Sequence, residues 1–241
     1  MIEKTRGIIL NQIKYSDSGI IARLYTRKFG RQSFLIRGMR SRKSGKHNIM
    51  FQPMFILDLE ISYKESREMN VLKEFSVSYS PYGIYSEIKT SSVAIFLGEV
   101  LTSVLREESS NEEMFDYIEK SIIYFDSCRE GYANFHIAFL AGLSSFLGFE
   151  PGTRKDANDS FFDMTNGTFV PVPPVNGNYA TPDVSDILAQ VFLASFDSIR
   201  NITLKGAMRN EVLDTLLRYY SLHLAGLKKI NSLEVLKEVF S

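Results

Sequence analysis

The chain has 241 residues, 44% of them apolar, so it can bury one large core or two modest ones and is not disordered throughout. Its 28 Lys and Arg residues balance 28 Asp and Glu residues, but the two signs are unevenly distributed. The first 50 residues hold 12 basic and two acidic side chains, against 16 basic and 26 acidic ones in the remainder, which gives net charges of +10 and −10. A single cysteine, Cys128, excludes an internal disulfide and a cysteine-cluster metal site.

Three features indicate an intracellular protein without a membrane segment. No long apolar run follows the N-terminal residues, so we predict no signal peptide. The most apolar stretch, residues 133–149, is interrupted by polar side chains and is too short to span a bilayer, so a buried helix is expected there. The single cysteine agrees with a reducing compartment, and we expect the cytoplasm of the cell.

Short segments of alternating polarity fill the first 80 residues and predict five strands with no helix among them. Gly30 lies in the predicted turn between the second and third strands, where its positive φ is allowed. Basic residues around Gly45 predict a loop that either contacts phosphates or is simply solvated. Five short strands are typical of the OB-fold, a small barrel that binds single strands through basic and aromatic side chains. The expected strands cover residues 7–15, 20–26, 31–40, 55–63 and 70–77.

After Pro81 the hydrophobic period changes from two to about 3.6 residues, which predicts helices. Asn111, followed by Glu112 and Glu113, is expected to cap one of them. Residues 150–182, rich in Gly, Pro, Asn, Asp and Thr, are expected to form an irregular insert. The sequence therefore predicts an α+β chain, with an OB-fold β-barrel domain over residues 1–80 and an all-α domain over residues 81–241. The expected helices cover residues 88–105, 112–128, 133–147, 184–196, 206–224 and 232–240.

None of the candidate catalytic patterns meets the requirements of its chemistry. Between Gly38 and Lys46 the glycine spacing differs from that of a phosphate-binding P-loop, and His47 stands where Ser or Thr would hold magnesium. The histidines are scattered, with no carboxylate or cysteine at metal-ligand spacing. No Gly-x-Ser-x-Gly elbow or Cys–His pair offers a nucleophile. We therefore predict that the protein is not an enzyme.

Motifs of moderate specificity follow one another along the chain. In order they are Arg6-Gly7-Ile8-Ile9-Leu10, Tyr15-Ser16-Asp17, Leu24-Tyr25-Thr26 with Phe29-Gly30, Arg37-Gly38-Met39-Arg40, Phe51-Gln52-Pro53-Met54-Phe55 and Phe146-Leu147-Gly148-Phe149-Glu150-Pro151. Taken together, and across essentially the whole chain, these motifs resemble the RecO family of bacterial recombination mediators. The resemblance implies an N-terminal OB-fold and a C-terminal helical domain, as the periodicity also does.

The resemblance implies a non-enzymatic function in the repair of double-strand breaks and gaps. Such proteins bind single- and double-stranded DNA and anneal complementary strands in the bacterial cytoplasm, at the nucleoid. With RecR they help to load RecA on strands coated by the single-stranded-DNA-binding protein SSB, whose acidic C-terminal tail they bind. No cofactor and no membrane are implied.

One departure from the family pattern concerns metal. Many members hold a zinc ion with four cysteines in the insert, but residues 152–182 contain none here, so we predict no structural zinc. We expect the segments around Phe162 and Phe169 to be packed by aromatic side chains instead of by metal.

Our hypothesis for the DNA-binding site places it on the basic N-terminal domain, because neutralised phosphates release condensed counterions. Tyr25 and Phe34 are the candidates for stacking on bases, and burial in the core is the alternative for each ring. The SSB tail needs an apolar slot with a basic rim, for which the candidates are Arg106, Lys120, Arg129 and Arg154. The residues expected to neutralise phosphates are Arg23, Arg27, Lys28, Arg31, Arg37, Arg40, Arg42, Lys43 and Lys46.

Two other functions agree with the same residues. A basic barrel could bind RNA, and only the helical domain with its Gly-Phe-Glu-Pro segment favours DNA repair over this reading. The basic domain could also dock on an acidic protein partner, in which case nucleic-acid binding would be weak. A comparison of RNA with DNA, and the addition of an SSB-tail peptide, separates these alternatives.

Overall fold

The computed structural model describes residues 2–16, 19–37, 50–64, 69–105, 110–128 and 130–240, with the side chain of Arg37 left out. The chain divides into two compact units. The first, which we call the sheet unit, combines Met1–Asp126 with Ile230–Leu236. The second, which we call the helical unit, combines Ser127–Lys229 with Lys237–Ser241.

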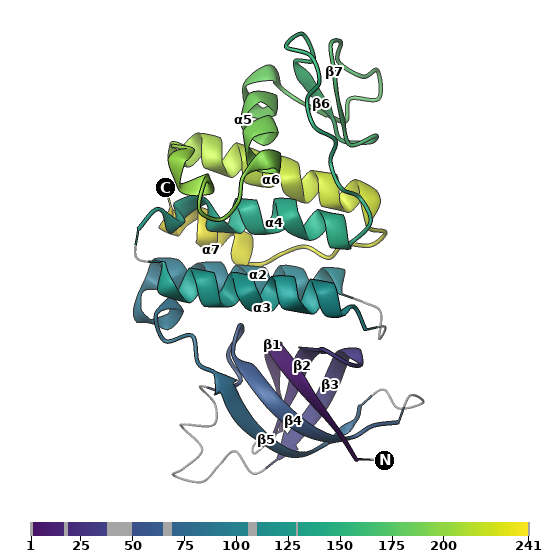
Figure 1. Ribbon diagram of the computed structural model, residues 1–241, viewed down its shortest axis with the longest axis vertical. Helices are drawn as coiled ribbons and strands as arrows, with labels where there is room; N and C mark the ends of the chain where they lie inside the picture. Colours follow the sequence, from purple (N-terminus) through teal and green to yellow (C-terminus); the bar gives the residue numbers. More distant parts are fainter. Residues whose placement is uncertain are drawn as a thin grey trace. The chain divides into compact units, whose positions relative to one another are not determined.

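The five predicted N-terminal strands are confirmed and form one curved antiparallel sheet in the order β3-β2-β1-β4-β5 (Figure 1). Along β2, Ile20, Ala22 and Leu24 point into the core, while Ile21 and Arg23 between them point outward. This alternation is the period-two pattern of a strand with one buried face. The strands are β1 (Ile2–Ser16), β2 (Gly19–Thr26), β3 (Gly30–Arg37), β4 (Ile56–Ser62) and β5 (Val71–Tyr79).

The sheet is not closed into a barrel, which corrects the expectation of a closed one. The edge strands β3 and β5 meet through a single parallel bridge between Phe34 and Asn70. There the Asn70 backbone N–H donates to the Ser33 carbonyl at 3.2 Å, and the Asn70 amide donates to Gln32 Oε1 at 2.8 Å. One bridge holds the two edges together without continuing the ladder, so the OB-type sheet stays partly open.

Helices α2 (Ile88–Val104), α3 (Glu112–Ser127) and the start of α7 (Ser232–Val239) complete the sheet unit. The expected cap of α3 is confirmed, because Asn111 Oδ1 accepts a hydrogen bond from the Met114 N–H at 2.9 Å. In α2, Glu99 accepts hydrogen bonds from the backbone N–H groups of Asn231 and Ser232 at 2.8 and 2.9 Å. The Ser232 hydroxyl donates to the same carboxylate at 2.6 Å, so Glu99 caps the first turn of α7.

The helical unit contains the other expected helices, and the predicted insert is more regular than expected. Residues 150–182 include a small antiparallel sheet in the order β7-β6-β8. These strands are too short to produce a readable period in the sequence. Helices and strands of this unit are α4 (Phe135–Phe146), α5 (Pro182–Leu193), α6 (Gly206–His223), β6 (Phe161–Asp163), β7 (Thr168–Val170) and β8 (Tyr179–Ala180). Single 3₁₀ turns occupy η1 (Ile84–Ser86), η2 (Tyr132–Asn134) and η3 (Ile199–Asn201).

Aromatic side chains pack the insert, as expected. The fully buried ring of Phe162 lies 5.0 Å from Phe169, 5.1 Å from Phe192 and 5.3 Å from Tyr219, measured between ring centroids. Because β6, β7, α5 and α6 each contribute one of these rings, the cluster ties the small sheet to the helices beside it.

The predicted boundary at residue 80 falls between β5 and the first helices, but α2 and most of α3 belong to the same compact unit as the five-stranded sheet. Within the described ranges, no group of three or more His, Cys, Asp or Glu side chains is arranged to hold a metal ion. In that same part of the chain, every helix is too short or too polar to cross a bilayer.

Candidate nucleic-acid interface

Arg27, at the turn after β2, is held by two carboxylates of α3. Its Nε lies 3.0 Å from Glu112 Oε2, and its Nη1 lies 2.6 Å from Asp116 Oδ1. The guanidinium also stands 5.8 Å from the ring centroid of Phe115. A phosphate would have to displace these acids, so Arg27 is a poorer DNA contact than its position in the sequence suggests.

Two further cations of the basic segment are paired in the same way, on the outward face of β1 and β4. Arg6 Nη1 lies 2.7 Å from Glu119 Oε1, and the hydrogen bond to Glu119 raises the pKa of the guanidinium. Lys4 Nζ lies 2.7 Å from Glu60 Oε1, and this hydrogen bond raises the pKa of the ammonium group. The Lys4–Glu60 pair is largely exposed and is worth little to stability, whereas Glu119 is only 16% exposed. Both pairs neutralise the local charge.

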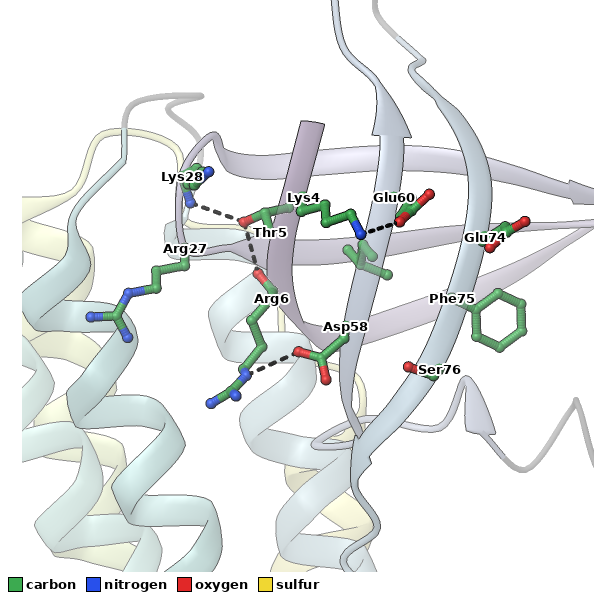
Figure 2. A pocket seen from close by; sticks show the side chains of 11 residues that line it. Lys4, Thr5, Arg6, Arg27, Lys28, Asp58, Glu60, Glu74, Phe75 and Ser76 are labelled. Atoms are coloured by element: carbon green, nitrogen blue, oxygen red, sulfur yellow. Dashed lines mark hydrogen bonds and ion pairs between the residues drawn. The ribbon is translucent and has the colours of Figure 1, made fainter. Parts of the chain in front are cut away.

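These pairs line a cleft of about 610 Å³, which we call the mixed-charge cleft (Figure 2). It runs from the turn after β2 across β1 and β4 to β5. Its cations are Lys4, Arg6, Arg27 and Lys28, and its acids are Asp58, Glu60 and Glu74. Because the two signs alternate, the cleft does not present the uniform positive potential that attracts a polyanion.

A second surface carries basic side chains that have no acidic partner among the described residues, and we call it the distal face. It consists of the β1–β2 hairpin beyond Ile9 and the outward side of β2. Arg23 is half-buried there, between Asn11 on β1 and Ser33 on β3. Lys14 is exposed at the far end of β1. Neither side chain makes a hydrogen bond or ion pair with any residue in the described part of the chain.

Lys28 and Arg31 belong neither to the carboxylate-paired cations nor to the distal face. Lys28 is exposed at the turn, and its ammonium group has no partner within the described ranges. Arg31 is half-buried on β3 opposite Tyr25, and its Nη1 donates to the main-chain oxygen of Thr102 at 3.4 Å.

The proposed stacking role of Tyr25 and Phe34 is corrected by their burial, because neither ring has a face open to a base. Phe34 is fully buried within the sheet. Tyr25 points outward but is 1% exposed, since α3 covers it: its ring stacks on Phe115 at 6.1 Å and its hydroxyl donates to the Asn111 carbonyl at 3.3 Å. This burial raises the pKa of Tyr25 to about 12.

The remaining candidates fall outside the described residues or are already engaged. The Arg37 side chain, Arg40, Arg42, Lys43 and Lys46 lie outside the described part of the chain, as do Arg106 and Arg129 among the candidates for the SSB tail. Arg154 pairs with Asp186 and stands 5.0 Å above the ring of Phe169, so it belongs to the packing of the insert. Lys120 is exposed on α3.

Two residues of the distal face were missed by the sequence reasoning, namely Lys14 and Tyr15. Both are exposed at the end of β1, and the Tyr15 side chain is 60% exposed. The signal available in the sequence was their place at the predicted end of the first strand, because side chains near the end of a hairpin strand escape the core whichever face they occupy.

Comparison with known proteins bears on the whole chain. The family model for the N-terminal part of recombination protein O matches residues 1–81, and the model for its C-terminal part matches residues 85–234. The chain is 37% identical to the DNA repair protein RecO of Phocaeicola vulgatus and 36% identical to that of Bacteroides fragilis, with both members of each pair covered completely. It is 33% identical to the DNA repair protein RecO of Flavobacterium psychrophilum over 99% of each chain. By sequence, this chain belongs to the RecO family.

Proposed function

We propose that this protein is a non-enzymatic DNA-binding recombination mediator of the bacterial nucleoid. It binds single- and double-stranded DNA, anneals complementary strands, and acts with RecR to help load RecA on SSB-coated single strands. Membership of the RecO family supports a role in DNA repair and recombination. Binding to the acidic SSB tail is part of the same proposal.

The observation that carries the proposal is the sorting of basic side chains on the sheet unit. Lys4, Arg6 and Arg27 are neutralised by acids around the mixed-charge cleft. Arg23 and Lys14 on the distal face have no such partners within the described residues. A cation without an acidic partner can neutralise a DNA phosphate and release its condensed counterion. DNA is therefore expected on the distal face and not in the cleft.

Annealing follows from the same electrostatics. Two complementary strands repel each other through their phosphates, and a basic surface that binds both lowers this repulsion and raises their local concentration. Annealing makes and breaks no covalent bond in the DNA, so the proposed activity requires no catalytic residue.

The test is the affinity for a labelled single-stranded oligomer, measured by fluorescence anisotropy across a salt series. Each lost phosphate contact flattens the log–log salt slope by roughly 0.7 for a single strand. We expect flattening in a Lys14→Ala/Arg23→Ala variant and in a loop variant, Arg42→Ala/Lys43→Ala/Lys46→Ala. A Lys4→Ala/Arg27→Ala variant, which removes two paired cations, is the matched control and is expected to keep the slope of the wild type.

The outcome that overturns this assignment is equal flattening in all three variants, or none in the first two. Tighter binding to RNA of the same sequence would favour the RNA-binding alternative. Annealing is followed with complementary fluorescent oligomers, and loading by the RecA ATPase on SSB-coated strands with RecR present. Failure of these two assays with intact DNA binding would leave a DNA-binding protein without the mediator function.

A further inference from the structure

Strand β1 contains two β-bulges, each of which inserts one extra residue into its ladder with β2. Between the Ile9–Leu24 and Asn11–Arg23 pairs, Leu10 has no partner on β2. Between the Lys14–Ile20 and Ser16–Gly19 pairs, the residue without a partner is Tyr15. Bulges bend a strand and redirect a side chain, and they recur beside functional sites.

The two extra residues have opposite surroundings. Leu10 is fully buried, so its bulge serves the packing of the sheet unit. Tyr15 is 60% exposed, and its ring and hydroxyl make no hydrogen bond or ring contact with any residue in the part of the chain that the structure describes. A large aromatic ring that a bulge presents to solvent in this way is available to a partner outside the chain.

The surroundings of Tyr15 match what a single strand requires. Ile13, two residues earlier, is 43% exposed, and Lys14 between them is exposed. Ile13 pairs with Ile21, and two residues further along the ladder Arg23 pairs with Asn11. At about 3.4 Å per residue, the Arg23 rung lies roughly 13 Å along the strand from Tyr15. The hairpin beyond Ile9 holds one acidic residue, Asp17, which lies outside the described residues.

We propose that Tyr15 is a stacking platform for a base of single-stranded DNA, with Lys14 and Arg23 contacting the phosphates on either side of it. An exposed ring beside unpaired cations is the combination that proteins use to hold single strands without reading their sequence. Bases in a duplex are already stacked on one another, so the platform selects single-stranded DNA. This inference rests on the proposed DNA-binding function and assigns to Tyr15 the role that Tyr25 and Phe34 cannot have.

The first test removes the bases and the ring separately. Tyr15→Ala is expected to weaken binding to an oligothymidylate by roughly 5- to 150-fold, the range for loss of one stacked base. The same variant should bind an abasic oligomer of equal length as the wild type does, because that backbone offers nothing to stack. Tyr15→Phe should keep the affinity of the wild type. Tyr82→Ala, which removes a 71% exposed tyrosine of the same unit, is the matched control.

The second test uses the absence of tryptophan from the whole chain. Tyr15→Trp introduces a single fluorophore at the bulge, and stacking on a base is expected to quench it. Oligothymidylate should quench this fluorescence, and the abasic oligomer should not. Tyr82→Trp is the control, and its emission should not respond to either oligomer.

The outcomes separate the two proposals. If the wild type binds DNA but Tyr15→Ala loses nothing, or loses equally on the abasic oligomer, the stacking role is overturned and the DNA-binding function stands. Quenching of Tyr82→Trp instead of Tyr15→Trp would move the platform elsewhere and likewise overturn the role. If the wild type binds no DNA at all, both proposals fall.

Discussion

Replacement of Phe162 by alanine tests whether aromatic packing holds the insert together in this protein. Phe162 lies at the centre of the cluster, is fully buried, and has three rings within about 5.3 Å of its centroid. Its backbone N–H also donates to the buried Ser185 hydroxyl at 2.9 Å, which fixes β6 against the start of α5. The substitution keeps this hydrogen bond and removes only the ring.

The expected loss is large because the ring has neighbours on several sides. Truncation of a fully buried phenylalanine to alanine costs about 3–5 kcal/mol, through the lost transfer free energy and the cavity that remains. Phe161, the preceding residue of the same strand, is half-buried and contacts Tyr179 alone among the aromatic rings of the insert, at 5.6 Å. Phe161→Ala should therefore cost about 1 kcal/mol, near the centre of measured point-mutant effects.

Hydrogen–deuterium exchange of the β6–β7 hairpin measures the effect locally. This choice matters because a chain of two compact units does not have a single free energy of unfolding. In Phe162→Ala the hairpin amides should exchange at least about 100-fold faster, which corresponds to the lower end of the expected loss. The wild type should exchange at the same rate with and without a metal chelator.

Two results would refute the reasoning. Equal effects of Phe161→Ala and Phe162→Ala would show that the ring cluster does not stabilise the hairpin. Faster exchange of the wild-type hairpin in the presence of a chelator would show that a metal ion holds the insert despite its lack of cysteine.

Three further predictions concern other parts of the chain. Because DNA is expected on the distal face and not in the cleft, release of Arg27 in a Glu112→Gln/Asp116→Asn variant should leave the single-strand salt slope unchanged. A slope steeper by roughly 0.7 would mean that DNA reaches this turn. Gly98→Ala should destabilise the sheet unit by about 1–3 kcal/mol in urea unfolding, because the new Cβ would lie 2.5 Å from the Leu10 carbonyl oxygen and 2.9 Å from Pro53 Cβ. The control Ser92→Ala, on the same helix, should cost less than about 0.5 kcal/mol. Burial, aided by the charge of Arg209, lowers the pKa of His136 from 6.5 to about 3, so the stability that neutral His136 contributes is present above pH 6.5 and is lost as the pH falls towards 3. The urea midpoints of unfolding at pH 7.5 and pH 4.5 should therefore differ less in His136→Leu than in the wild type. An equal difference in the two proteins would contradict the lowered pKa.

The elements of this fold could be predicted because each follows a local pattern. In β2 the buried Ile20, Ala22 and Leu24 alternate with outward residues, and the period alone identifies the strand. The cap at Asn111 is equally local, because its side chain satisfies an N–H three residues ahead. What these patterns could not give was closure of the sheet, which depends on how far two distant edges approach each other.

The candidate site was harder to predict, because it depends on contacts distant in the sequence. Tyr25 shares the outward face with Arg23, as its spacing indicates, but Phe115 of α3 covers it from 90 positions further along the chain. Arg27 and Arg23 look alike in sequence, and only the position of Asp116 shows that one is neutralised and the other is not. Tyr15 was missed because the two or three residues at the end of a strand are too few to show that a bulge has shifted the alternation of polar and apolar side chains.

The capping of α7 by Glu99 has a consequence for the order in which the protein folds during synthesis. The carboxylate and its partner Ser232 are separated by 133 residues, and the entire Ser127–Lys229 segment of the helical unit is made between them. A ribosome that has released the sheet and α2 has therefore not yet made the residues that complete the same compact unit. The sheet unit therefore begins first, but its last contacts form only after most of the helical unit has been synthesised.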